Sequence, residues 1–174
     1  MHVITGGPHC GKTSLINCLK EKKELILPET AREIIEEKGI PKGDELMEFQ
    51  KEVYRRQEKM ENSLVNKQYI NVFLDRGLGD SLAYFKRNFN HVPIGFRKSL
   101  AGRYSTIFFL EPIEFQNDGY RLEKNSEEAI DVHKFIEREY RNQGYDIIHV
   151  PLFNGKTEKE AIEKRAEFVL SRTN

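Results

Sequence analysis

A glycine-rich segment near the N-terminus, Gly-Gly-Pro-His-Cys-Gly-Lys-Thr, constrains the fold of this chain more than any other feature. It fits the pattern G-x-x-x-x-G-K-[ST], a P-loop, in which glycines let the backbone come close to a phosphate and successive N–H groups converge on its oxygens. Such a loop needs a strand before it and a helix after it, with the helix N-terminus facing the phosphate. The sequence supplies an apolar strand over His2–Thr5 and a helical pattern over Lys12–Lys20. It therefore predicts a nucleoside triphosphate site at this loop.

The loop and the first residues of the following helix provide the expected nucleotide-binding residues, which are Gly6, Gly7, Pro8, His9, Cys10, Gly11, Lys12, Thr13 and Ser14. In this motif the lysine reaches the β- and γ-phosphates and the hydroxyl residue ligates Mg²⁺, roles that fall here to Lys12 and Thr13. Cys10 is expected to contribute only its backbone. ATP and Mg²⁺ are therefore the expected ligands.

Beyond the loop, short β-type runs alternate with longer helical patterns, which predicts an α/β fold with a parallel sheet covered by helices on both faces. The strand candidates are His2–Thr5, Glu24–Leu27, Tyr69–Leu74, Tyr104–Leu110 and Asp146–Val150. Apolar residues at helical spacing predict helices over Asp44–Asn66, over Glu127–Tyr140 and around Ile162–Leu170. His133 and His149 are separated from other candidate ligands and are expected to be ordinary structural residues.

The composition is that of one globular domain over residues 1–174 with a polar surface. Lys and Arg together number 28, as do Asp and Glu, so net charge gives no reason to expect nucleic acid or a membrane as a partner. No apolar run approaches the roughly 20 residues that a membrane span needs. The first strand begins at once and leaves no room for a cleavable signal, and the spacing of Cys10 and Cys18 is not of a metal-binding type. We therefore expect a reduced, cytoplasmic setting, with monomer or homodimer left open.

A second candidate site follows the third strand, where an apolar run ends in Asp75-Arg76-Gly77. Ligands of parallel sheets bind at the carboxyl ends of the strands, so Asp75 is expected at the same edge as the P-loop. A carboxylate there can hold Mg²⁺, and an arginine beside it can donate to a transferring phosphate.

A third candidate is Glu29, which follows the second strand and begins a helix. A carboxylate at that edge could accept the proton of an attacking hydroxyl during phosphoryl transfer. Acidic residues also occur in first helical turns because the helix dipole favours them, so a purely structural role stays open. Whether Glu29 or Asp75 is the base is likewise open.

The segment 111–125 joins an apolar strand to a helix and is longer and more charged than a minimal connection. In a kinase, a lid at this place would close over the nucleotide, exclude water and bring an arginine to the phosphate. Arg121 is the candidate for that role. The alternative is a solvated charged loop.

Together these motifs resemble the P-loop small-molecule kinases, and among them an AAA-type NTPase/kinase domain family grouped with nicotinamide riboside kinases. The resemblance runs from end to end, through the Gly-Gly-Pro loop, PETAREII (28–35), FLDRGLGDSLAY (73–84) and DGYRLE (118–123). The chain is also similar to deoxynucleoside kinases, although Asp75-Arg76-Gly77 replaces their more usual Glu-Arg-Ser.

The resemblance implies several features that spacing alone does not give. It implies the strand order 2-3-1-4-5 of a three-layer P-loop fold, a base at Glu29, an acid–arginine pair at Asp75 and Arg76, and a lid arginine at Arg121. It implies that Gln50 holds the acceptor, with Glu29 and Arg76 beside it. It also implies that adenine lies near the lid and the loop over residues 151–156.

The favoured hypothesis is an ATP- and Mg²⁺-dependent phosphotransferase that acts on a hydroxyl of a nucleoside-like or other small molecule. The acceptor pocket is expected between the Asp44–Asn66 helix and the Ser81–Arg97 region. A P-loop NTPase that hydrolyses ATP or GTP, perhaps under control of a partner, is the alternative. A GTP-dependent switch is disfavoured because the chain lacks a guanine-reading N-K-x-D motif.

Overall fold

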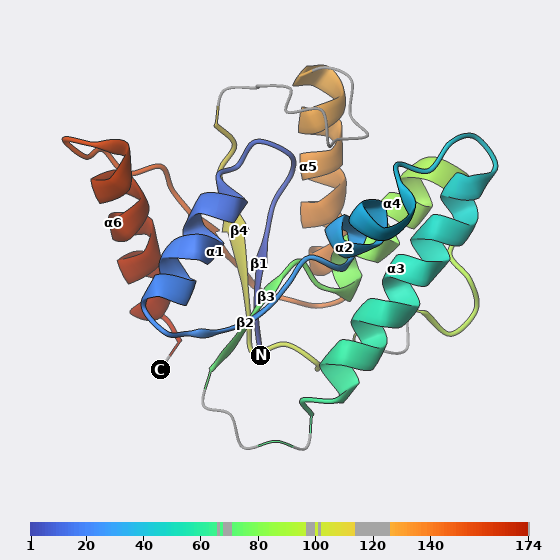
Figure 1. Ribbon diagram of the computed structural model, residues 1–174, viewed down its shortest axis with the longest axis horizontal. Helices are drawn as coiled ribbons and strands as arrows, with labels where there is room; N and C mark the ends of the chain where they lie inside the picture. The colour runs from blue at the N-terminus through green and yellow to red at the C-terminus, as the bar shows by residue number, and fades with distance from the viewer. Residues whose placement is uncertain (66, 68–70, 97–99, 101, 114–125, 174) are drawn as a thin grey trace.

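The computed structural model describes residues 1–65, 67, 71–96, 100, 102–113 and 126–173. Within these ranges the chain alternates strands and helices as the sequence predicts (Figure 1). The elements in chain order are β1 (His2–Thr5), α1 (Lys12–Glu21), β2 (Leu25–Leu27), α2 (Thr30–Lys38), α3 (Glu45–Asn62), β3 (Val72–Asp75), α4 (Leu78–Phe89), β4 (Thr106–Leu110), α5 (Ser126–Asn142), β5 (Ile147–Val150) and α6 (Glu158–Leu170).

The strands form one five-stranded parallel sheet in the order β2-β3-β1-β4-β5. This confirms both the parallel sheet and the strand order. β1 lies at the centre, where His2 is in register with Phe73 of β3 and with Thr106 of β4. The strand that leads into the P-loop is therefore flanked by strands on both sides.

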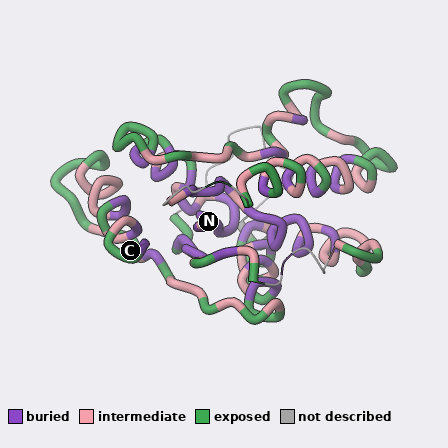
Figure 2. The backbone as a smooth tube through the Cα atoms, turned by 90° about the horizontal axis from the view of Figure 1, so that it is seen from below, coloured by how far each residue is buried: buried purple, intermediate pink, exposed green. Residues whose placement is uncertain are grey.

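Helices cover both faces of the sheet, because successive strand residues point to opposite faces. Val3 of β1 and Leu74 of β3 pack with α3, α4 and α5, whereas Ile4 and Phe73 pack with α1 and α6. Figure 1 shows the same division, with α1 and α6 on one side of the strands and α3, α4 and α5 on the other. In Figure 2 the strands are mostly buried, while the helices alternate buried and exposed turns. The three-layer arrangement is thus confirmed.

The carboxyl ends of three neighbouring strands converge on one edge of the sheet. β1 continues into the P-loop, β3 ends at Asp75, and β2 leads through Pro28 to Glu29, the N-cap of α2. α2 is held in place by Ile34, which packs against Phe49 and Val53 of α3. This edge therefore gathers the predicted site residues.

The structure differs from the sequence predictions mainly at element ends. The third strand includes Asp75 as its last residue, and the helix expected over Asp44–Asn66 ends at Asn62. Helix α4 was not predicted, although Leu78, Leu82 and Phe85 bury one face of it at helical spacing. None of the described helices is long and apolar enough to cross a membrane.

Candidate functional site

The P-loop takes a conformation that depends on two glycines with positive φ. Gly6 has φ 146° and Gly11, the N-cap of α1, has φ 72°, a region that favours glycine. A Cβ on Gly6 would lie 3.0 Å from the carbonyl oxygen of Leu110 at the end of β4. The loop is therefore packed closely against β4, and this packing restricts the conformation of the loop.

Lys12 and Asp75 face one another beneath this loop. Lys12 Nζ lies 3.5 Å from Asp75 Oδ1, and the two side chains are 6% and 11% exposed. Burial raises the pKa of Asp75, an effect that Lys12 opposes. Among the described residues, no hydrogen bond reaches Asp75 Oδ1. An oxygen acceptor is thus available next to the phosphate-binding motif.

Arg76 connects the P-loop to Glu29. Its guanidinium donates from Nε to Glu29 Oε1 at 2.7 Å and from Nη1 to the carbonyl oxygen of Gly6 at 3.2 Å. The residue has φ 72°, an uncommon conformation for a side chain of this size. The structure therefore brings together Lys12, Glu29, Asp75 and Arg76, all four of the predicted catalytic residues that lie in its described part.

Asp80, in the first turn of α4, fixes Arg76 from the other side. Its carboxylate accepts from Arg76 Nη1 at 2.8 Å, from the Thr5 hydroxyl at 2.6 Å and from the Tyr140 hydroxyl at 2.8 Å. It also accepts from the backbone N–H of Gly77 at 3.1 Å. Asp80 is not among the residues predicted from the sequence, although an acid in a first helical turn shortly after a strand-end acid–arginine pair is a usable signal.

A cavity of about 100 Å³ opens next to Arg76 between α2, α3 and α4. Its polar lining comes from Glu29, Thr30, Gln50, Gln57, Arg76, Asp80 and Ser81. Its apolar and aromatic lining comes from Ala31, Ile35, Phe49, Val53 and Tyr84. Both regions expected to form an acceptor pocket, Asp44–Asn66 and Ser81–Arg97, therefore contribute to one cavity, and α2 adds a third wall.

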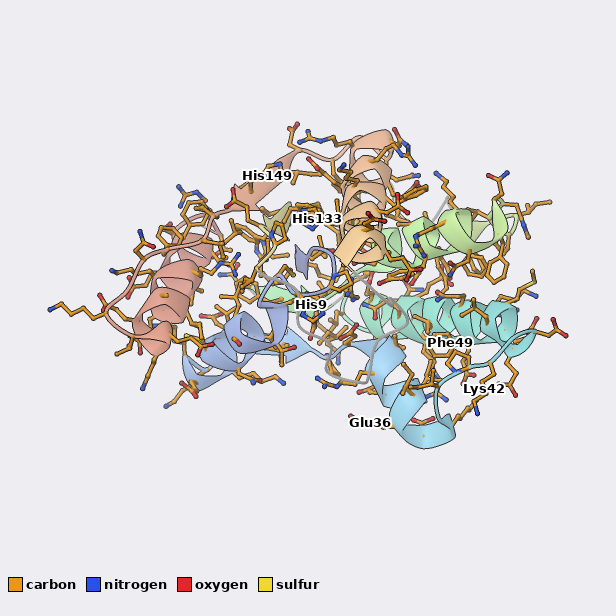
Figure 3. All side chains as sticks on the ribbon, turned by 90° about the horizontal axis from the view of Figure 1, so that it is seen from above. His9, Glu36, Lys42, Phe49, His133 and His149 are labelled. Carbon is orange, nitrogen blue, oxygen red and sulfur yellow. The ribbon has the colours of Figure 1, made fainter. Side chains whose placement is uncertain are left out.

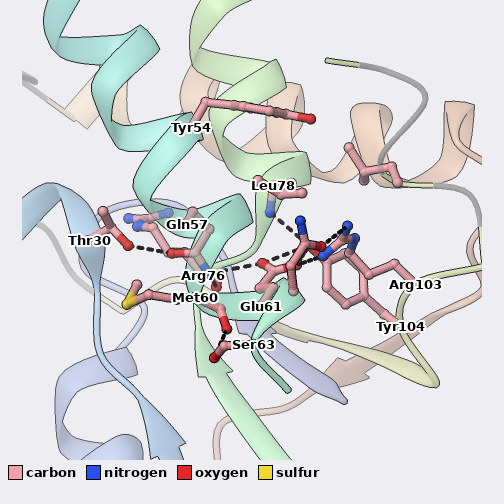
Figure 4. A network of polar contacts seen from close by, with 12 residues as sticks. Thr30, Tyr54, Gln57, Met60, Glu61, Ser63, Arg76, Leu78, Arg103 and Tyr104 are labelled. Atoms are coloured by element: carbon pink, nitrogen blue, oxygen red, sulfur yellow. Dashed lines mark hydrogen bonds and ion pairs between the residues drawn. The ribbon is translucent and has the colours of Figure 1, made fainter. Parts of the chain in front are cut away.

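A buried polar network supports the floor of this cavity (Figure 4). Gln57 accepts a hydrogen bond from the Thr30 hydroxyl and donates to the carbonyl oxygen of Arg76 at 3.2 Å. Gln57 also donates to the carboxylate of Glu61, which is fully buried. The Tyr104 hydroxyl and Nη1 of Arg103 donate to the same carboxylate. Since Thr30 follows Glu29 directly, Gln57 links the residue after Glu29 to the backbone of Arg76.

Two residues outside the motif hold the P-loop itself. Arg165 of α6 donates to the carbonyl oxygen of Cys10 at 2.8 Å and to those of Val150, Pro151 and Glu111. His133 of α5 accepts the backbone N–H of Gly7 at Nδ1 over 3.0 Å. No signal in the sequence marks either residue, because each depends on helix packing. Nε2 of His149 lies 3.2 Å from Oε1 of Glu137 on α5.

Several predictions fall on residues outside the described ranges or are not tested by geometry. Arg121, Asp118 and most of the lid-like segment 111–125 lie outside the described residues. The loop over residues 151–156, expected near adenine, begins at Pro151, which Arg165 joins to the P-loop carbonyl of Cys10. Among the described residues, no cluster of three or more His, Cys, Asp or Glu could hold a metal without help from a ligand.

The sequence model of the AAA domain family matches residues 1–159, so the chain belongs to that family. No protein of curated function matches the sequence. Among solved structures, the chain is similar to a NadR protein in complex with NR, at 23% identity and a TM-score of 0.72. That similarity covers 99% of this chain and 51% of the NadR chain, so this chain spans about half the length of that protein.

Two further structures match over nearly their whole length. Deoxyadenosine kinase from M. mycoides is 15% identical with a TM-score of 0.64, covering 99% of this chain and 98% of that one. Shikimate kinase from Acinetobacter baumannii is 16% identical with a TM-score of 0.59, covering 98% and 90%. The chain therefore has the same fold as these kinases, which confirms the expected fold. The expected AAA-type domain family is confirmed by the match of its sequence model to residues 1–159.

Proposed function

We propose that this protein is an ATP- and Mg²⁺-dependent phosphotransferase that acts on a hydroxyl of a nucleoside-like small molecule. The observation that carries the proposal is the position of Arg76, which contacts the P-loop at Gly6 and lines the cavity together with Glu29. A phosphate held by the loop and a hydroxyl held in the cavity would meet at this residue. Phosphoryl transfer needs chiefly such positioning and charge stabilisation.

Glu29 is the better placed of the two candidate bases. It lines the cavity, whereas Asp75 is not among the cavity-lining residues and faces Lys12. A base must lie within hydrogen-bond reach of the hydroxyl that it deprotonates. We therefore assign proton acceptance to Glu29, and the Arg76 contact keeps its carboxylate oriented toward the P-loop.

The residues present fit Mg²⁺ and ATP. Magnesium prefers oxygen ligands, and the chain offers the exposed Thr13 hydroxyl and the Asp75 carboxylate, whose Oδ1 lies 3.5 Å from Lys12 Nζ. Bound Mg²⁺ supplies neutralisation of phosphate charge. Lys12 and the loop N–H groups would hold the phosphates, and Arg76 would stabilise charge on the transferring group, with Arg121 proposed to join it from the lid.

The cavity lining suits an acceptor that has both polar groups and a flat ring. Glu29, Arg76 and Asp80 supply charged groups, and Phe49 and Tyr84 supply aromatic surface. Gln50 is only 4% exposed, and no hydrogen bond joins it to another described residue. Its amide carries both donors and an acceptor, so an acceptor ring with adjacent donor and acceptor groups would pair with it.

The test is a thermal-shift screen of nucleosides, nucleotides, vitamins and other hydroxylated metabolites with ATP and Mg²⁺, followed by a transfer assay with γ-labelled ATP on each hit. Phosphorylated product from a nucleoside-like compound is the expected result. ATP turnover that releases only inorganic phosphate, unchanged by any compound, would instead establish a simple NTPase. Tight preference for GTP over ATP in a binding titration would contradict the nucleotide assignment.

A further inference from the structure

The hydrogen bond between the P-loop and α5 joins residues 126 positions apart in the chain. The backbone N–H of Gly7, at the start of the loop, donates to Nδ1 of His133 at 3.0 Å. Figure 3, seen from above, shows His133 on α5 close to the loop that carries His9. The same peptide group is held at its other end by Arg76, whose Nη1 donates to the carbonyl oxygen of Gly6 at 3.2 Å.

Close packing on both sides restricts the position of the His133 ring. A Cβ on Gly7 would lie 2.7 Å from the Cβ of His133 and 3.1 Å from the carbonyl oxygen of Ala129, so only glycine allows α5 to come this close. On its other side, the His133 ring packs on Phe109 of β4 with 4.4 Å between ring centroids. The ring is thus held between the sheet and the loop.

The direction of the hydrogen bond fixes the chemical state of His133. A ring nitrogen can accept an N–H only when it carries no proton, so the ring must be neutral with its proton on Nε2. Burial lowers the pKa of His133, with an opposing effect from Glu137 on the same helix and a further lowering from His149 on β5. The surroundings therefore favour the state that the geometry requires.

We propose that His133 is a positioning residue for the nucleotide phosphates, which fixes the first turn of the P-loop by accepting the Gly7 N–H. The amides that follow Gly7 then remain directed at the phosphates before ATP arrives. A loop arranged in advance binds more tightly because less ordering accompanies binding. The inference rests on the proposed binding of ATP at this loop and adds a residue from outside the motif.

The test compares two substitutions of His133 that differ in whether the new side chain can accept the Gly7 N–H. His133→Phe keeps a flat ring but removes the acceptor, whereas His133→Asn offers an amide oxygen near the place of Nδ1. We expect the Phe variant to bind ATP with Mg²⁺ about five- to tenfold more weakly by calorimetry, the equivalent of one hydrogen bond, and the Asn variant to recover most of that loss. His149→Phe is the control, since His149 is exposed and contacts Phe109 from β5.

Equal affinity of the Phe variant and the parent, or equal weakening by Phe, Asn and the His149 control, would overturn the inference. If the parent itself does not bind ATP, the proposed function fails instead. A measurement on the unaltered protein is independent of how the variants fold: the ¹⁵N imidazole shifts of His133 near neutral pH. The Nε2–H tautomer is expected, and a proton on Nδ1 contradicts the hydrogen bond.

Discussion

The P-loop and the cavity beside it are built by different means. The loop is one continuous segment between β1 and α1 whose glycines and backbone N–H groups set its shape. Its backbone is also held from outside by Arg76, His133 and Arg165. The cavity is lined by side chains from α2, α3 and α4 and from the end of β3, which are distant in sequence. Backbone geometry therefore defines the first region, and side-chain chemistry defines the second.

This difference explains why one region is general and the other selective. Backbone N–H groups recognise any phosphate chain of suitable length, whatever side chains stand at the variable positions of the motif. The cavity presents Glu29, Gln50 and Tyr84 as individual side chains, so a single substitution changes what it can hold. Substitutions in the two regions should accordingly change different kinetic constants.

The largest effect is expected from Lys12→Ala in the P-loop. Lys12 is 6% exposed and forms an ion pair with Asp75. Its loss would remove the positive charge proposed to bind the phosphates and would leave the buried Asp75 carboxylate without this ion pair. We expect transfer to fall by about 10²–10³-fold or more. Single-turnover transfer of labelled phosphate measures this, with the exposed Lys20→Ala on the same helix as control. Near-normal turnover would refute the mechanism.

The next largest effect is expected from Glu29→Gln. The substitution preserves shape and removes the base, so kcat should decrease by about 10²–10⁴-fold while ATP affinity stays unchanged. Steady-state kinetics combined with ATP calorimetry separate the two quantities. Glu36→Gln, an exposed change on the same helix, should leave both intact. Unchanged kcat in Glu29→Gln would leave that residue a structural role only, as the partner of Arg76.

A smaller effect, confined to the cavity, is expected from Gln50→Leu. The change keeps the buried volume but removes the amide that no described residue satisfies. The KM for a nucleoside-like acceptor should rise about tenfold, and the KM for ATP should not change. Gln143→Leu, directly after the end of α5 and outside the cavity lining, is the control. An equal rise in both KM values would show that the two regions are not separable.

The smallest effect is the response of folding stability to acid. Burial lowers the pKa values of His2 and His133, so below pH ~6.5 the unfolded chain binds more protons than the folded chain. Stability from these groups is therefore fully present above pH ~6.5 and decreases as pH falls toward their folded values. The melting temperature should decrease less between pH 7.5 and 5 in His133→Asn than in the parent. An identical decrease would mean that His133 titrates as in the unfolded chain.

Much of the fold could be predicted from short-range patterns. Ile107 to Leu110 form a continuous apolar run and are all buried in a central strand, and the five predicted strands all exist, with ends shifted by a few residues. Helix α4 was missed because its polar residues, Asp80 and Ser81, are buried by contacts with distant elements. The burial of these polar residues cannot be predicted from the local spacing of apolar residues.

The candidate site was predictable where chemistry follows a strand end. Glu29, Asp75 and Arg76 each stand next to a strand, so their shared edge follows from the parallel sheet. Asp80, His133 and Arg165 were not found, because their roles depend on hydrogen bonds to backbone or side chains far along the chain. Those partners are set by helix packing.

The sequence by itself determined the phosphate-binding loop, because eight adjacent residues carry the whole pattern and the neighbouring strand and helix orient it. It also determined the alternation of strands and helices, which is a local property of hydrophobic spacing. Only the tertiary structure decided that Arg76 meets Glu29, 47 residues away, and that Arg165 meets Cys10 across 155 residues. Directional hydrogen bonds at such separations form only after the sheet and its helices have packed, so no local pattern encodes them.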